Sequence, residues 1–394
     1  MTTSEPDRRA GAEASAVSVL AVASHRPAKV FEPLAVTDLE VAALELDEDV
    51  GPLARVESAT RRTRRAIRRH DPDLLLLDCF ETLGAPAMWV ADRHDVPVVA
   101  RQVGDNWRKL DEEFLARARA QRDVPQYLRH HLSRRMNRFI FERAAGFVTV
   151  STALADVVAR RTGCPPGRVG VVPVPVTADT ATGSATAARA ATGVEADRVL
   201  LTVTNLNFRA KLSGAERILS AVLPLLRADS NLAYLVAGGG RHHDELLAAI
   251  DDAVDDPAVR RRIHAPGHVD AVADLYALAD VFVYVSDLDG YPNVVLEAQT
   301  AGVPVVANDA HGMCDQITDG ETGYLVDPDV PGALRERVES LLSDPEARRR
   351  LGEAGRDRTR RENDPAVVGE RLAAFLAGLH ADLQADRGAT VRGL

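Results

Sequence analysis

Short apolar runs alternate along this chain with longer segments in which apolar residues recur every three or four positions. Apolar runs bounded by turn residues are typical of strands buried on both faces of a parallel sheet, and the longer segments predict amphipathic helices. The first series comprises strands over 16–23, 74–78, 96–100 and 147–150, with helices over 54–69, 85–94 and 112–145. The second comprises strands over 199–203, 233–237, 281–285 and 303–307, with helices over 214–227, 244–254, 270–278 and 293–301.

This alternation predicts an α/β fold of two doubly wound, Rossmann-like domains that face a central cleft. We expect the first domain over 16–176 and the second over 194–364. The segment 177–193 between them is rich in Ala, Thr and Gly and poor in bulky apolar residues, which predicts a linker. Residues 1–15 are polar and are expected to be disordered, and 365–394 are expected to hold a further helix.

Composition and charge narrow the class of protein. The net charge of -10 over 394 residues argues against a general nucleic-acid-binding role, which would require a basic surface. No apolar segment approaches the roughly 20 residues that span a bilayer, and the polar start lacks the apolar core of a signal peptide. We therefore expect a cytoplasmic protein. The three cysteines are odd in number and lack metal-ligand spacing, so a disulfide framework is not expected.

Arginine supplies almost all of the positive charge, since only Lys29, Lys109 and Lys211 are lysines. Arginines crowd the segments 61–69 and 117–143. Two interpretations stay open: these are solvated helix faces, or they form a cationic surface that meets an anionic membrane or a phosphate-bearing acceptor. Peripheral contact with the inner face of a membrane is therefore kept as an alternative.

The most informative segment runs from Asp289 to Ala298. The apolar run 281–285 ends in a Ser-Asp-Leu-Asp-Gly turn, and Pro292 then occupies a position typical of a helix start. The free backbone N–H groups and the dipole of such a helix can bind a phosphate, and Gly290 lets a ligand approach the backbone. Asp289 and Glu297 flank this anion site, and carboxylates accept hydrogen bonds from sugar and ribose hydroxyls. A nucleotide sugar fits this combination.

This segment resembles the donor-binding signature of retaining glycosyltransferases of family 4, which have the GT-B fold. The shared pattern is an acid, seven residues and a glutamate, with Gly-Tyr after the first acid and Glu-Ala at the end; Asp289 stands where the family usually has glutamate. The resemblance implies that Asp289 contacts the transferred sugar and that Glu297 binds the ribose diol. It assigns the diphosphate to the backbone of Gly290, Tyr291, Pro292, Asn293 and Val294. It also implies that the last helix returns to brace the first domain. The alternative is a surface turn whose acids have only local roles.

The loop after the 199–203 strand resembles the loop that carries a basic pair to the diphosphate in this family. Lys211 matches the family lysine, whereas Asn205 stands in the place of the family arginine. Arg209 is a candidate for the second positive charge from a shifted position. A solvated loop charge is the alternative role for Lys211.

Two further loops resemble donor-binding loops of the family. Gly239 lies in the Gly-Gly-Gly turn after the 233–237 strand, and His268 and Val269 lie in a loop that faces the nucleobase in the family. The glycines alone also fit an ordinary strand-to-helix turn, and His268 alone fits a structural role.

The first domain departs further from the family pattern. Gly104 stands where many members have a histidine near the transferred sugar, and the aspartate that follows is retained as Asp105. The usual histidine contact is therefore absent or supplied from elsewhere. Taken together, the resemblance implies Asp289, Lys211 and Asp105 as catalytic residues.

The implied function is transfer of a sugar, with retention, from a UDP- or GDP-sugar to an acceptor hydroxyl during glycan biosynthesis. The helix N-terminus and Lys211 would stabilise the leaving group, so neither a metal nor a further cofactor is expected. The acceptor is a glycan, a lipid-linked molecule or a small molecule, and the sequence does not choose among these. Two other classes stay open: a non-catalytic nucleotide-sugar-binding partner, and a GT-B hydrolase or epimerase of nucleotide sugars.

Overall fold

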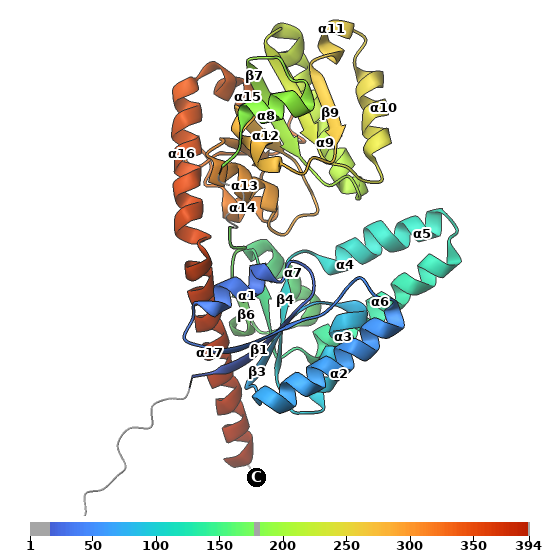
Figure 1. The fold of residues 1–394 in the computed structure, drawn as a ribbon, viewed down its shortest axis with the longest axis vertical. Coiled ribbons are helices and arrows are strands. Elements are labelled where there is room, and N and C mark those ends of the chain that lie inside the picture. The colour runs from blue at the N-terminus through green and yellow to red at the C-terminus, as the bar shows by residue number, and fades with distance from the viewer. Residues whose placement is uncertain (1–15, 177–181, 393–394) are drawn as a thin grey trace, which may run out of the picture.

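The computed structural model describes residues 16–176 and 182–392, which form two α/β domains stacked one above the other (Figure 1). Each domain contains a six-stranded sheet whose paired strands all run parallel. The predicted fold class is therefore confirmed. The expected disorder of residues 1–15 concerns a segment outside the described residues, as does the part of the predicted linker over 177–181.

The first sheet has the strand order β2-β1-β3-β4-β5-β6. Successive side chains of a strand point to opposite faces, so Leu75 and Leu77 pack under α2, α3 and α6, while Leu74 and Leu76 pack against α1 and α17. The elements of this domain are β1 (Ser18–Ala23), α1 (Ala28–Ala35), β2 (Glu40–Glu45), α2 (Pro52–His70), β3 (Leu74–Asp78), α3 (Glu81–Asp92), β4 (Val98–Gln102), α4 (Asn106–Arg108), the π-helix η1 (Lys109–Leu115), α5 (Ala116–Ala120), α6 (Val124–Arg143), β5 (Gly146–Thr149), α7 (Thr152–Thr162), the 3-10 helix η2 (Pro166–Arg168) and β6 (Val169–Val171).

The second sheet has the strand order β12-β11-β10-β7-β8-β9. The strands β7 to β9 extend the sheet toward one edge and β10 to β12 extend it toward the other, so the strand order reverses between β7 and β10. Helices α9, α10 and α15 cover one face, and α8, α12 and α13 cover the other. The elements are α8 (Ala185–Thr192), β7 (Arg198–Val203), α9 (Arg209–Ala228), β8 (Leu232–Ala237), α10 (His243–Ala253), α11 (Pro257–Arg260), β9 (Ile263–Gly267), α12 (Val272–Leu278), β10 (Val281–Tyr284), α13 (Asn293–Ala301), β11 (Val305–Asn308), α14 (Met313–Gln316), β12 (Tyr324–Val326), α15 (Ala333–Ser343), α16 (Pro345–Glu362) and α17 (Pro365–Arg392).

Part of the predicted linker is helical. Ser184 caps α8 by accepting from the N–H of Ala187, and its own N–H donates to Asp274. Helix α8 packs against α12, and Ala188 lies in the core of the second domain. Small residues therefore mark a short helix here, because alanine is a strong helix former even where it buries little surface.

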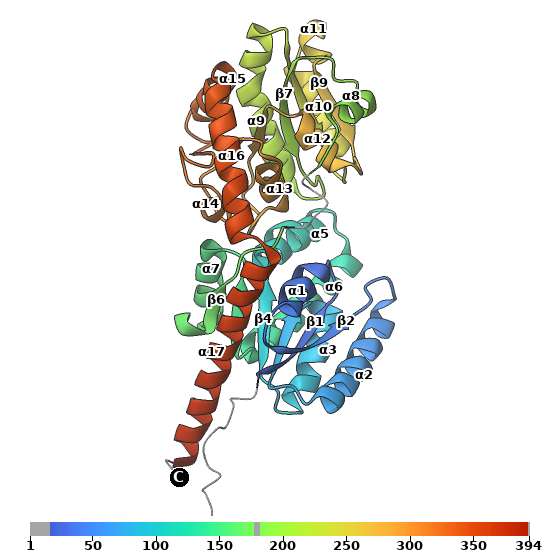
Figure 2. The same ribbon diagram turned by 60° about the vertical axis from the view of Figure 1, so that its left-hand side comes forward.

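Two features join the domains. Helix α16 lies along the second domain and α17 continues along the first, as Figure 2 shows. Val368, Leu372 and Leu376 of α17 are buried against the first sheet. Near the cleft, Tyr291 and Leu296 of the second domain pack in one apolar cluster with residues of the first.

The segment expected as one helix over 112–145 bends back on itself. It forms η1 and α5, reverses near Arg122, whose φ is 53°, and continues as α6. Asp123 accepts from the N–H of Gln126 and Pro125 stands in the first turn, so a new helix start interrupts the periodic pattern. The resulting helical arm projects from the first domain on the side that faces the second domain (Figure 1).

Candidate active site

A cavity of about 700 Å³ lies at the carboxyl ends of the second sheet. Val203, Thr204 and Tyr284 line it where β7 and β10 adjoin, which is the topological switch point at which open α/β sheets bind ligands. Arg26 and Lys109 of the first domain line the opposite side. The predicted donor residues that line the cavity are Asn205, Lys211, Gly239, His268, Val269, Asp289, Pro292, Asn293, Val294 and Glu297.

One end of the cavity holds a cluster of Lys211, Asp289 and Tyr284. The Lys211 ammonium contacts both the Asp289 carboxylate and the Tyr284 hydroxyl, and that hydroxyl donates to the same carboxylate over 2.6 Å. Burial acts to raise the pKa of Asp289, but the Lys211 charge and the hydrogen bonds outweigh it, so the pKa is lowered. Burial, the Asp289 charge and their hydrogen bond raise the pKa of Tyr284. At neutral pH Asp289 is therefore a carboxylate and Tyr284 a protonated phenol.

The other end of the cavity holds Glu297, which projects from α13. The hydroxyl of Tyr276 lies 3.0 Å from Glu297 Oε2 and donates to it. Burial and the neighbouring carboxylate raise the pKa of Tyr276, so the tyrosine stays a donor at neutral pH. Tyr276 thereby fixes one oxygen of Glu297. Among the described residues no hydrogen bond reaches Oε1, and this oxygen can accept from a ligand.

Between these ends lies the N-terminus of α13. The N–H groups of Val295 and Leu296 donate to the carbonyl of Pro292, which leaves the N–H groups of Asn293 and Val294 without a partner among the described residues. Asn293 Oδ1 is also buried without a partner in the described part of the chain. Free N–H groups and the helix dipole together favour an anion. The site thus places an anion position between two carboxylates.

Four predicted site residues have other contacts. The Arg209 guanidinium pairs with Glu245 of α10 over 2.6 Å, and Arg209 is not among the residues that line the cavity. The Asp105 carboxylate accepts from the N–H of Arg108 and caps α4. The Tyr291 hydroxyl accepts from Asn363 in the interdomain cluster. A Cβ at Gly290 would lie 3.0 Å from the carbonyl oxygen of Val103, so this glycine lets the first domain approach closely.

Sequence reasoning missed several residues of the cleft: Arg26, Lys29, Lys109, Tyr276 and Tyr284. A signal for two of them was present, because all three lysines of this arginine-rich chain lie at the cleft. The Lys29 ammonium donates to the carbonyl of Pro175 over 2.8 Å. Burial lowers its pKa to about 8, although the charge of Glu297 opposes that shift.

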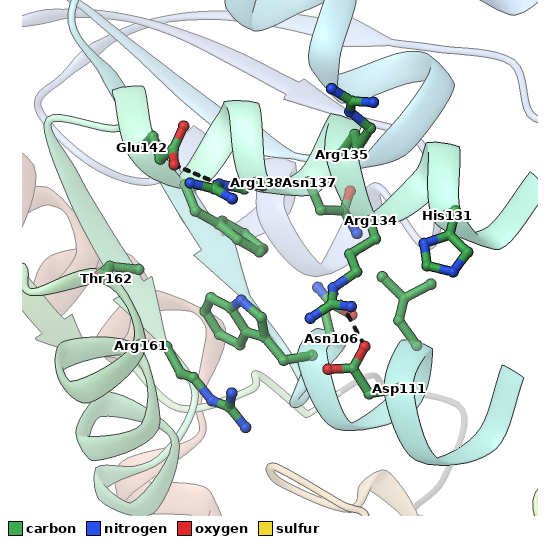
Figure 3. A pocket seen from close by; sticks show the side chains of 13 residues that line it. Asn106, Asp111, His131, Arg134, Arg135, Asn137, Arg138, Glu142, Arg161 and Thr162 are labelled. Atoms are coloured by element: carbon green, nitrogen blue, oxygen red, sulfur yellow. Dashed lines mark hydrogen bonds and ion pairs between the residues drawn. The ribbon is translucent and has the colours of Figure 1, made fainter. Parts of the chain in front are cut away.

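Two of the further cavities in the first domain are lined in part by residues of η1. The larger, of about 650 Å³, is lined by Trp107, Phe141 and the arginines at positions 134, 135, 138 and 161, and Figure 3 shows the arginines. Two of these arginines are engaged, Arg134 with Asp111 and Arg138 with Glu142. The smaller, of about 240 Å³, lies at the carboxyl ends of β1 to β4, and its polar lining includes Ser24, Glu48, Glu81, Asn106 and Asn137. It shares Lys109 with the donor-side cavity.

Two other features are absent from the described ranges 16–176 and 182–392. These residues contain no group of three or more His, Cys, Asp or Glu side chains placed to hold a metal ion. They also contain no helix that combines the length and the apolar character needed to cross a membrane.

Comparison with known proteins identifies the class that this fold and site define. Residues 186–358 match the family model of glycosyl transferases group 1, and residues 8–175 match that of the glycosyl transferase 4-like domain. Solved structures share the fold. Anabaena HepE in complex with UDP and glucose superposes with a TM-score of 0.65 at 16% identity, over 92% of this chain and 99% of that one. A sucrose-phosphate synthase from Thermosynechococcus elongatus gives 0.65 at 18% identity, over 93% and 100%.

Curated relatives narrow the class to a family. A GDP-mannose-dependent alpha-(1-6)-phosphatidylinositol monomannoside mannosyltransferase of Mycolicibacterium smegmatis is 31% identical over 44% of this chain and 46% of its own length. A D-inositol 3-phosphate glycosyltransferase of Segniliparus rotundus is 29% identical over 52% and 47%. CapM, a capsular polysaccharide biosynthesis glycosyltransferase of Staphylococcus aureus, is 32% identical over 27% and 28%. The matches thus span a quarter to a half of these relatives. The chain belongs to the group 1 glycosyltransferases of family 4 type, with the GT-B fold.

Proposed function

We propose that this protein transfers a sugar, with retention of anomeric configuration, from a nucleoside diphosphate sugar to an acceptor hydroxyl. The observation that carries the proposal is the free N-terminus of α13 between Asp289 and Glu297 in one cavity. A diphosphate matches the helix start and a polyol matches each carboxylate. A nucleotide sugar contains these groups in this order.

Each contact follows from the chemistry of the site. The Glu297 carboxylate accepts from the ribose hydroxyls, and the N–H groups of Asn293 and Val294 donate to the diphosphate. Asp289 accepts from hydroxyls of the transferred sugar. Lys211 contacts Asp289, and its ammonium also faces the phosphate nearest to the sugar. His268 and Val269 line the nucleobase end. UDP and GDP sugars are the proposed donors, since named relatives and neighbours use GDP-mannose or bind UDP.

Chemistry proceeds by exchange of two bonds at the anomeric carbon. The bond from that carbon to the diphosphate oxygen breaks, and a bond to the acceptor oxygen forms on the same face. The acceptor proton passes to the departing phosphate oxygen. Charge grows on the leaving group, where the α13 N-terminus and Lys211 stabilise it. We propose that these groups suffice without a metal ion and that the enzyme forms no covalent intermediate.

We propose the smaller first-domain cavity for the acceptor, because it opens beside Lys109 next to the donor-side cavity. An anionic membrane surface is the proposed location of the reaction. Helix α3 packs between α2 and α6, so the two arginine-rich segments lie on one face of the first domain. Along α6, Val124, Leu128 and Leu132 are exposed at intervals of four residues and form an apolar stripe beside these arginines. The acceptor is then lipid-linked or lies close to the membrane.

A panel of nucleotide sugars in a thermal-shift assay tests the proposal, followed by product analysis with the ligands that bind. A ligand at 100 times its Kd stabilises a protein by about 2.7 kcal/mol, which is readily measured. Binding followed by an α-linked product from an α-linked donor is the expected result. If release of free sugar is the only reaction, the protein is a hydrolase of nucleotide sugars and not a transferase. Binding without turnover on any acceptor would favour a non-catalytic partner, and absence of all binding would refute the donor site.

A further inference from the structure

Lys109 occupies a central position that the motifs of the donor site do not assign. It is the first residue of η1, and it lines both the donor-side cavity and the smaller cavity of the first domain. It interacts electrostatically with Asp289 and Lys211 across the cleft. The only π-helical stretch among the described residues therefore carries a lysine to the meeting point of the two cavities.

Gly104 provides the space for this ammonium. A Cβ built at Gly104 would lie 2.8 Å from Lys109 Nζ, too close for an undisturbed lysine. The backbone of Gly104 also forms an isolated antiparallel bridge with Asp289, so the two residues adjoin across the domains. Any larger residue at position 104 would take the place of the ammonium beside Asp289.

The ammonium of Lys109 lacks a carboxylate of its own. No ion pair or hydrogen bond joins it to another group within the described residues. Asp289 is already engaged by Lys211 and Tyr284, and Asp105 caps the N–H of Arg108. Burial lowers the pKa of Lys109 because an ammonium removed from water without a partner is unfavourable. Two ammonium groups thus face one carboxylate, and the excess positive charge favours an anion.

The arm that carries Lys109 is attached to the second domain on both sides of this residue. The guanidinium of Arg108 donates to the carbonyl of Asp287. The Glu113 carboxylate accepts from the N–H groups of Arg209 and Ala210 at the start of α9, each over 3.2 Å. These contacts hold Lys109 in the cleft, where a bound ligand would meet it.

We propose that the ammonium of Lys109, which occupies the space beside Gly104, binds the diphosphate of the donor. Lys109 makes this contact from the side of the first domain. Lys211 supplies one positive charge from the second domain and Lys109 supplies the other. This arrangement explains how the site can have Asn205 in the place of the family arginine while Arg209 pairs with Glu245. The inference rests on the proposed donor site. Its consequence is that a nucleoside diphosphate contacts both domains.

Calorimetry with UDP and GDP, and with uridine and guanosine as phosphate-free probes, tests this role. Lys109→Met is expected to raise the Kd of the diphosphate that the wild type binds by about tenfold or more, because a hydrogen bond to a charged group is lost. Lys109→Arg should restore part of that affinity. Binding of the nucleoside should not change. Equal diphosphate affinity in wild type and Lys109→Met would overturn the inference.

Gly104→Ala provides a second test that leaves the lysine in place. The new methyl group displaces the end of a flexible side chain, so the fold should survive while diphosphate affinity falls. In the Lys109→Met background the same substitution should have no further effect, because the ammonium is already gone. Gly51→Ala is the matched control, since a Cβ there meets nothing within 4 Å. Additive losses at positions 104 and 109 would contradict the shared mechanism. If the wild type binds neither diphosphate, the proposed function fails instead.

Discussion

Replacing Glu297 with alanine should weaken binding of the free nucleoside diphosphate. Tyr276 holds Oε2 of this carboxylate at 3.0 Å and leaves Oε1 free to accept from the ribose. Loss of one hydrogen bond to a charged group costs about 1.5 to 3 kcal/mol, which corresponds to a roughly 10- to 150-fold rise in Kd. Titration calorimetry with UDP or GDP measures this change directly.

Two matched variants make the measurement specific. Tyr276→Phe removes the hydroxyl that orients Glu297 but keeps the carboxylate, so the rise in Kd should be smaller. Asp289→Asn should leave diphosphate affinity unchanged or improve it, since the neutral side chain no longer neutralises Lys211, and should weaken only the binding of the complete sugar nucleotide. The reasoning is refuted if a folded Glu297→Ala protein binds the diphosphate as tightly as the wild type, or if Asp289→Asn loses both ligands equally.

Three further predictions concern charge. Lys211→Ala should lower kcat more than it raises KM for the donor, because leaving-group charge is greatest in the transition state. The activity of the wild-type enzyme should survive EDTA. Loss of activity on chelation, with recovery in Mg²⁺, would contradict the metal-free mechanism. The pKa of Lys29 is lowered from 10.5 to about 8, so between these pH values the unfolded chain binds the extra proton and the free energy of unfolding should rise with pH. Denaturant titrations of the wild type and Lys29→Met across this range should diverge, and parallel curves would show that the shift is absent. The protein should co-sediment with vesicles that contain anionic lipid at low salt and be released at high salt. Equal binding to anionic and neutral vesicles would show that the arginine surface does not bind the membrane.

The central strands of both sheets could be predicted from the sequence, whereas the outer strands could not. Leu74 to Leu77 form an unbroken apolar run because β3 is covered on both faces. The missed strands β2, β6, β9 and β12 stand at the sheet edges. β2, for example, consists of exposed and half-buried residues with a single buried one, Leu44. A strand that buries few side chains needs few apolar residues, so its sequence shows no clear apolar pattern. Such a strand forms because the neighbouring strand offers hydrogen-bond partners.

The residues of the proposed donor site also divide into those that a local sequence pattern predicts and those that depend on long-range contacts. The segment from Asp289 to Glu297 is contiguous, so its turn and helix could be predicted along with the anion site between its acids. Lys109 could not be assigned, because its role depends on the arm bending back across the cleft. Gly290 and Tyr291 contact the first domain, and no local pattern encodes an interdomain contact.

A crystal structure of the protein with the nucleoside diphosphate it binds would show whether the start of α13 is the phosphate site. We expect the diphosphate at the N–H groups of Asn293 and Val294, with the ribose hydroxyls on Glu297. A diphosphate bound away from the start of α13, or a ribose that does not contact Glu297, would contradict this expectation.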